Sequence, residues 1–167
     1  NVFNFFVAPP VITPGGTRSR TLDAFVNSAT AQFASATTNA QFLFTVDGSD
    51  PRTNTARVQT TVNTPFTMAT NSVVTVVGIR SGFTTSAPVT LKIDIQTPPP
   101  VMSETLGYFP QGKEITATVP GRADAVIYYR FDGQPPTTND NRYTGKIIFD
   151  GLSSDRRDLR SLSLRAF

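Results

Sequence analysis

FLFTVDGSDP at residues 42–51 returns as IYYRFDGQPP at residues 127–136. In each copy an apolar strand runs into Asp-Gly, and a proline follows three residues after the glycine. Asp-Gly followed by proline is typical of a tight turn at the end of a strand. The copies lie 85 positions apart, which is the size of a small domain. A repeat at this spacing predicts two similar units in tandem.

The composition predicts an all-β fold. Thr occurs 25 times in 167 residues, and β-branched and aromatic residues suit the pleated surface of a sheet. The 13 prolines and 11 glycines supply turns between short strands. We expect two tandem β-sandwiches with an N-terminal extension strand. The expected boundaries are an extension at 1–8, a first sandwich at 9–96, a proline-rich linker at 97–100 and a second, incomplete sandwich at 101–167.

Several classes of function are excluded by what the sequence lacks. It has no Cys and no His, on which zinc sites, thiol nucleophiles and Ser-His-Asp triads depend. The net charge is +3 and the basic residues are scattered, which does not indicate a nucleic-acid partner. No stretch is long and apolar enough for a membrane span. The chain begins at Asn1 rather than Met, which we interpret as a processed mature protein or an excised fragment.

The Asp-Gly segments resemble the C-terminal-type domain of chitobiase and β-hexosaminidase. That family's pattern runs from an aromatic strand into Thr-x-Asp-Gly-x-x-Pro, and residues 44–51 and 129–136 follow it. Residues 143–147 resemble the family's next element, and residues 162–167 resemble its penultimate strand. The resemblance implies immunoglobulin-like or fibronectin-III-like sandwiches. It also implies an extracellular or cell-surface setting, because such modules occur in surface enzymes, surface layers and fibrous proteins.

Four aspartates are the candidate metal ligands. The preferred interpretation of Asp47 and Asp132 is structural, because each is the Asp of an Asp-Gly turn. With Asp50 and Asp140 they also supply the oxygen ligands that Ca²⁺ prefers, although no run matches an EF-hand loop. We therefore expect no cofactor, with calcium as the alternative.

Three tyrosines are the candidate glycan-binding residues. Related modules accompany sugar-processing enzymes, and a sugar platform needs exposed flat aromatic rings. The chain has no Trp, so Tyr108, Tyr128 and Tyr143 are the plausible stacking residues. This favours a second interpretation, a glycan-binding or spacer pair from a larger cell-surface glycoside hydrolase or adhesin.

The N-terminal segment is unusually apolar, with Phe3, Phe5, Phe6 and Val7 in seven residues. Phe3, Phe5 and Val7 share one face under the two-residue period of a strand. One interpretation is that they form an edge strand of the first unit. The family pattern begins near Pro10, however, so the segment is surplus to that unit by the resemblance.

The second unit lacks a counterpart of one strand of the first. If residues 162–167 correspond to residues 74–79, the second unit has no segment that corresponds to the alternating strand at 89–95. A sandwich without its last strand exposes an unpaired edge that favours strand addition. We therefore predict donor-strand complementation: residues 1–7 of one copy fill the acceptor edge at Leu162, Leu164 and Phe167 of the next. The alternative is a truncated chain.

The predicted function is structural and not enzymatic. Head-to-tail strand donation that does not close builds a fibre, tube or layer. We expect an extracellular subunit of such an assembly, whose partner is another copy of itself, with polysaccharide as a further candidate partner.

Overall fold

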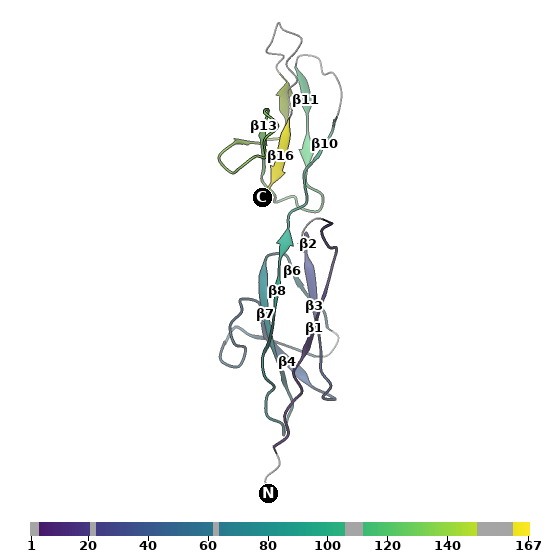
Figure 1. Ribbon diagram of the computed structural model, residues 1–167, viewed down its shortest axis with the longest axis vertical. Helices are drawn as coiled ribbons and strands as arrows, with labels where there is room; N and C mark the ends of the chain where they lie inside the picture. Colours follow the sequence, from purple (N-terminus) through teal and green to yellow (C-terminus); the bar gives the residue numbers. More distant parts are fainter. Residues whose placement is uncertain (1–3, 21–22, 62–63, 106–111, 150–161) are drawn as a thin grey trace. The chain divides into compact units, whose positions relative to one another are not determined.

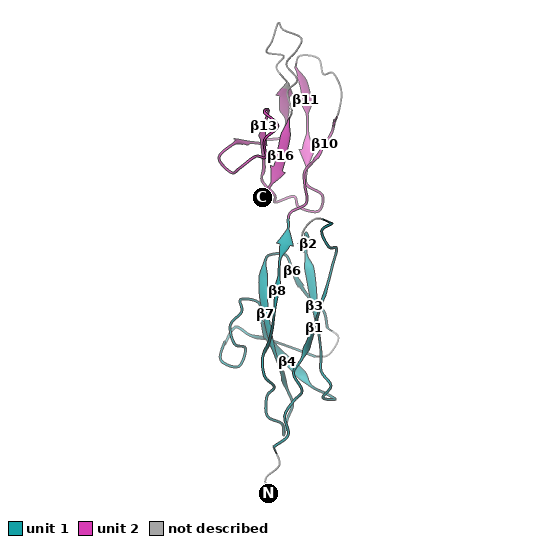
Figure 2. Cartoon of the chain, viewed as in Figure 1, with its two compact units in different colours: residues 1–96 teal, residues 97–167 magenta. Residues whose placement is uncertain are grey.

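The structure, a computed structural model, is all-β, as the composition predicts (Figure 1). It describes residues 4–20, 23–61, 64–105, 112–149 and 162–167. These residues form no helix, and therefore none that could cross a membrane. The chain divides into two compact units, which we call unit 1 (residues 1–96) and unit 2 (residues 97–167) (Figure 2).

Unit 1 holds two antiparallel sheets. The first has the order β1-β3-β6, with strands at Val11–Gly15, Ala29–Ala34 and Phe66–Met68. The second has the order β5-β4-β7-β8, with strands at Val58–Thr60, Gln41–Thr45, Ser72–Ile79 and Val89–Ile93. A short parallel pair joins β2 and β9, at Phe25–Val26 and Ile95–Gln96.

The two sheets of unit 1 enclose a core of phenylalanine rings. Phe33 of β3 lies 5.8 Å from Phe42 and 5.0 Å from Phe44 of β4, measured between ring centroids. All three side chains are at most 1% exposed. Alternation places them there, because successive residues of a strand point to opposite faces. Aromatic contacts across the sheets therefore hold this sandwich together.

Unit 2 also holds short antiparallel strands. β10 pairs with β12 and β11 pairs with β15, at Val101–Met102, Ala117–Thr118, Lys113–Ile115 and Ile147–Phe149. The remaining sheet has the order β14-β13-β16, at Asn141–Arg142, Ile127–Arg130 and Ser163–Ala166. These pairings follow the plan of unit 1, with β13 in the place of β4, β14 in that of β5 and β16 in that of β7.

The strand registers make the correspondence explicit. Phe42 of β4 faces Gly78 of β7, and Ile127 of β13 faces Ala166 of β16. Phe42 and Ile127 occupy the same place in the repeated segment, so β16 corresponds to the second half of β7. Two residues earlier, Leu164 corresponds in the same way to Val76 of β7.

The core of unit 2 is built from smaller side chains. In unit 1, Ile12 of β1 faces Phe33 of β3, whereas in unit 2 Met102 of β10 faces Ala117 of β12. An alanine thus stands where unit 1 has the central phenylalanine. The buried cluster comprises Ala117, Val119 and Ile127, and the half-buried residues Met102, Ala125, Tyr143, Leu164 and Ala166 pack against it.

Candidate functional site

The sheets of the two units differ at one edge. β7 is hydrogen-bonded to β4 on one side and to β8 on the other. β16 is hydrogen-bonded to β13 and, among the described residues, to no second strand. A strand edge without a partner presents N–H and C=O groups that another strand can pair with. This edge of β16, which we call the open edge, is the candidate functional site.

The backbone pattern shows which groups the open edge presents. Val126 and Phe167 exchange two hydrogen bonds, at 3.2 and 3.0 Å between nitrogen and oxygen. In an antiparallel ladder such pairs alternate with pairs whose backbone groups point outward. The N–H and C=O groups of Leu164 and Ala166 therefore point away from β13.

The corresponding groups of unit 1 have partners. Gly78, the counterpart of Ala166, donates its N–H to Ser86 Oγ at 2.8 Å and accepts from the Ser86 N–H at 3.0 Å. Val76, the counterpart of Leu164, faces Val89 of β8. The open edge is therefore a difference between two otherwise similar sheets.

The β8 strand also supplies core side chains that unit 2 receives from no described strand. Ile93 is 2% exposed in the core of unit 1, and Val89 and Leu91 pack against that core half-buried. These residues are two positions apart, so all three point from β8 to the same face. In unit 2 the Leu162 and Leu164 side chains are half-buried beside the position that such a strand would fill.

The described part of the N-terminal segment lies against unit 1. The Val7 N–H donates to the Thr84 carbonyl at 3.0 Å, and the Thr84 N–H donates to the Phe5 carbonyl at 2.7 Å. Val7 is 2% exposed, so it belongs to unit 1 rather than being surplus to it. The family resemblance did not predict that Val7 belongs to unit 1, because the family pattern begins near Pro10.

The phenylalanines of the segment remain outside the core. Phe5 is 63% exposed and Phe6 is 64% exposed, and the Phe5 ring lies 5.6 Å from the Phe83 ring between centroids. Phe3 lies outside the described residues. Val7 is therefore buried in unit 1, whereas Phe5 and Phe6 are largely exposed to solvent.

The three predicted acceptor residues do not share one face. Leu164 packs against the core of unit 2. Phe167 lies on the opposite face, where its ring centroid is 5.7 Å from that of Tyr128. Phe167 is 42% exposed. The physical reason is parity, because residues at odd spacing along a strand point to opposite faces.

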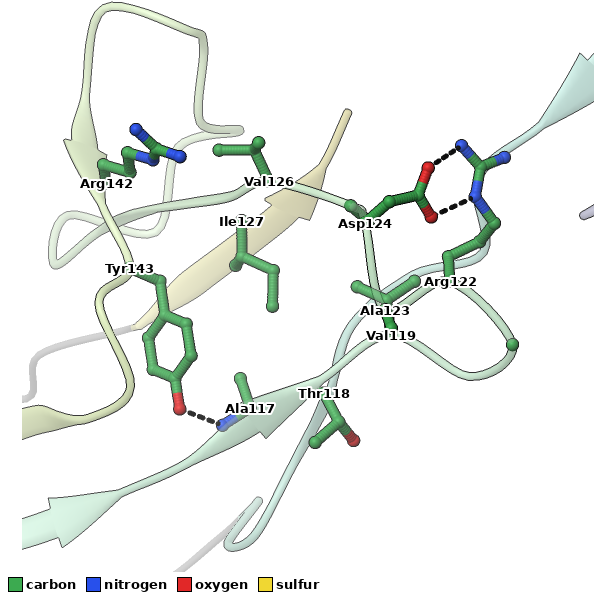
Figure 3. Close-up of a pocket in the computed structure, with 12 residues that line it drawn as sticks. Ala117, Thr118, Val119, Arg122, Ala123, Asp124, Val126, Ile127, Arg142 and Tyr143 are labelled. Atoms are coloured by element: carbon green, nitrogen blue, oxygen red, sulfur yellow. Dashed lines mark hydrogen bonds and ion pairs between the residues drawn. The ribbon is translucent and has the colours of Figure 1, made fainter. Parts of the chain in front are cut away.

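Unit 2 also has an open depression of about 700 Å³ beside Ala117 (Figure 3). Tyr143 lies at its side: its hydroxyl accepts from the Ala117 N–H at 2.9 Å and donates to the Gly145 carbonyl at 2.5 Å. Among the described residues that line the depression, Asp124 is the one carboxylate, and it is held by Arg122 at 2.9 Å. This arrangement contains no pair of acid and base groups for catalysis.

The Asp-Gly turns use their aspartates as local acceptors. Asp47 Oδ1 accepts from the Ser49 N–H at 3.1 Å and from its hydroxyl at 2.6 Å, which lowers the pKa of Asp47. Asp132 Oδ1 likewise accepts from the Gln134 N–H at 3.1 Å. The glycines that follow have φ of 81° and 76°, a conformation that favours glycine.

Three of the four candidate calcium ligands, Asp50, Asp132 and Asp140, face arginines. Asp50 is paired with Arg52, and Arg130 lies 2.5 Å from Asp132 and 3.6 Å from Asp140. Within the described residues no three acidic side chains gather around one point where a metal ion could bind. In unit 2 a guanidinium therefore lies between the two carboxylates that a cation would need.

These contacts predict a loss of stability in acid. Hydrogen bonding to Arg52 lowers the pKa of Asp50, and hydrogen bonding to Arg130 lowers the pKa of Asp132, each from an ordinary value of 3.8. The folded state then binds fewer protons than the unfolded state, so stability is full above that value and falls as the pH drops through the lowered pKa. We expect the melting temperature to fall as the pH drops below about 4.

The measurement is a pH series of thermal melts, in which Asp132→Asn should show a smaller acid-induced fall than the parent chain. A melting temperature that stays constant or rises below pH 4 would contradict this assignment.

The predicted glycan-binding tyrosines have separate surroundings. Tyr143 is half-buried and its hydroxyl is engaged within unit 2, so it is not an exposed stacking ring. Tyr128 is half-buried on the outer face of the β14-β13-β16 sheet. Tyr108 lies outside the described residues.

Comparison with known proteins adds no assignment: no family model matches the chain, and no curated protein matches it.

Proposed function

We propose that the protein is a non-catalytic structural subunit of an extracellular filament, tube or layer, assembled head-to-tail by donor-strand complementation. The N-terminal segment of one copy adds to the open edge of β16 in the next. The observation that carries the proposal is that the backbone groups of Leu164 and Ala166 point away from β13 and meet no strand among the described residues. Strand addition gives such groups partners.

The spacing of the apolar side chains supports this occupant. In unit 1 the strand beside β7 presents Val89, Leu91 and Ile93 at two-residue intervals. Phe3, Phe5 and Val7 have the same intervals. A strand of this segment beside β16 would present its apolar face toward Leu164, as β8 does toward Val76 in unit 1.

The present position of the segment sets the cost of donation. Residues 5–7 would give up two backbone hydrogen bonds to Thr84, and Val7 would leave its buried position. In return Phe5, which is 63% exposed, would be buried. In the donated strand Val7 would be buried again on the face it shares with Phe5, and bonds to the open edge would replace those to Thr84. The net gain is then the burial of Phe5, about 1.5–3 kcal/mol, which favours donation when a second copy is available.

The resemblance to the C-terminal-type domain of chitobiase and β-hexosaminidase supports the proposed setting. Modules of that family occur in surface enzymes, surface layers and fibrous proteins. On this ground we propose an extracellular setting, with a second copy of the chain as its partner.

The test compares assembly of the parent chain with that of a double variant, Phe3→Asp with Phe5→Asp. This variant keeps Val7 and its hydrogen bonds to Thr84, so unit 1 stays intact. We expect the parent chain to form polymers with rising concentration, and the variant to remain a monomer of 18.1 kDa by light scattering and electron microscopy.

Val11→Asp is the matched control, because Val11 is an exposed apolar residue of β1, 61% exposed, outside the proposed contact. This control should assemble like the parent. Assembly of the double variant at the parent's concentrations would refute the proposal, and so would a parent chain that stays monomeric throughout.

A further inference from the structure

A second surface of unit 2 has a different chemistry from the open edge. The outer face of the β14-β13-β16 sheet carries Tyr128 on its central strand. Arg142 of β14 and Arg165 of β16 are its directly opposed neighbours on the two sides. Directly opposed residues of antiparallel strands project from the same face. Two cations therefore flank one aromatic ring.

The side chains of this face contact one another. The Tyr128 and Phe167 ring centroids lie 5.7 Å apart, and the Arg165 guanidinium carbon lies 4.7 Å from the Phe167 centroid. On the other side Arg142 extends toward Val126, at the rim of the depression described above (Figure 3). We call Arg142, Tyr128, Arg165 and Phe167 the basic aromatic patch.

The two arginines have no acidic partner in the described part of the chain. The other described arginines of unit 2 do: Arg122 is paired with Asp124, and Arg130 with Asp132 and Asp140. Arg142 and Arg165 are exposed and take part in no ion pair with a described residue. As far as the described residues go, the patch therefore carries two positive charges without an acidic partner, which an anionic partner would complement.

The patch is particular to unit 2 and not a property of the repeat. In unit 1 the counterpart of Tyr128 is Leu43, whose directly opposed neighbours are Gln59 of β5 and Val77 of β7. None of these three side chains is charged or aromatic. The same backbone frame thus carries a charged aromatic surface in one unit and a neutral one in the other.

We propose that the basic aromatic patch binds an anionic polysaccharide. Tyr128 offers a ring against which the apolar face of a sugar can pack. Arg142 and Arg165, two strand spacings apart and thus separated by roughly 10 Å, offer forked donors to carboxylate groups along the polymer. The guanidinium group is suited to bidentate carboxylate recognition, for which lysine is a poorer donor.

This inference does not depend on strand donation. The patch uses the outer face of the sheet, whereas the open edge uses the backbone groups of Leu164 and Ala166 and the inner side chain of Leu164. Binding to the patch can therefore be measured in the monomeric Phe3→Asp, Phe5→Asp variant as well as in the parent chain.

The experiment measures binding of the full chain to polygalacturonate, a carboxylated polysaccharide, by calorimetry and by the retardation of the protein in gels that contain the polymer. The test variant is Arg142→Gln with Arg165→Gln. The matched control is Arg20→Gln with Arg57→Gln, which removes two exposed arginines from unit 1. Neutral dextran serves as the uncharged polymer.

We expect the test variant to bind polygalacturonate about tenfold more weakly or worse, because it loses two charge-assisted contacts, while the control stays within about twofold of the parent. Tyr128→Leu, which copies Leu43, should also weaken binding. Equal losses in both double variants would overturn the proposal, as would the absence of binding by the parent. Tighter binding to a single-stranded DNA oligonucleotide than to polygalacturonate would overturn it in favour of a nucleic-acid surface.

Discussion

Joining a copy of residues 80–95 to the chain after Phe167 is expected to stabilise unit 2 by about 3 kcal/mol and to abolish assembly. The added segment contains the turn and strand that complete the sheet of unit 1. It would place a second copy of Val89, Leu91 and Ile93 at the open edge, beside Leu164. The edge of β16 that a second copy would use would then be occupied.

The magnitude follows from three contributions. Burial of three apolar side chains contributes about 1.5–3 kcal/mol each. Ladder hydrogen bonds along the strand add about 1 kcal/mol each. Ordering the 5 residues of the strand costs about 1–2 kcal/mol per residue, and closing the loop before it costs about 2 kcal/mol more. The balance is a few kcal/mol in favour of the filled edge.

The chain offers a selective probe for this measurement. All 4 tyrosines lie in unit 2, at positions 108, 128, 129 and 143, and there is no tryptophan. Tyrosine fluorescence during urea unfolding therefore follows unit 2 alone, while circular dichroism follows both units. The matched control is the same extension with serine in place of the three apolar residues, which should neither stabilise unit 2 nor prevent assembly. Equal unfolding midpoints for the two extensions would count against an open edge.

Replacement of Phe33 by alanine is expected to cost unit 1 about 3–5 kcal/mol. Phe33 is 1% exposed and contacts the rings of both Phe42 and Phe44, so its removal leaves a cavity between the sheets. Those two rings belong to β4 and the lost ring to β3, so the surrounding strands can close the space only in part. Circular dichroism should show unit 1 unfolding at lower urea, with the tyrosine transition unchanged.

Leu43→Ala is the control for Phe33→Ala, because Leu43 is a half-buried residue of β4 on the outer face of the facing sheet. It should cost clearly less than the core substitution. If Phe33→Ala moved the tyrosine transition as far as the unit 1 transition, the two units would not be separate cores, and the assignment of this residue to unit 1 alone would be wrong.

Unit 2 has alanine, Ala117, at the position that Phe33 holds in unit 1, and a tyrosine compensates for the smaller side chain. Ala117 holds the register position of Phe33, and the Tyr143 hydroxyl reaches its backbone N–H. Tyr143, the residue that follows β14, thus fills part of the space that the phenylalanine ring occupies in unit 1. An open depression remains beside it.

Local chemistry made the fold class and the turns predictable. The repeated Asp-Gly segment indicates a turn because glycine tolerates positive φ and aspartate accepts from the backbone two residues later, and both turns have that form. Composition alone was enough for the all-β class, because it depends on the sum of many weak preferences.

The pairing partner of each strand was harder to predict from the sequence. Alternation places Phe3, Phe5 and Val7 on one face, yet it cannot tell which strand accepts them, and the contact of Val7 with Thr84 spans 77 positions. The patch around Tyr128 depends in the same way on register. A shift of β16 by one residue would place Arg165 on the inner face.

The direction of the backbone groups in β16 has a consequence for amide exchange with solvent. The Arg165 N–H points toward β13 and is held in the ladder, whereas the Leu164 and Ala166 N–H groups point away from it. Amide hydrogens along this strand therefore alternate between slow and fast exchange with deuterium. In β7 the Gly78 N–H donates to Ser86 Oγ, whereas the N–H of its counterpart Ala166 meets no partner strand among the described residues. We therefore expect Gly78 to exchange more slowly than Ala166.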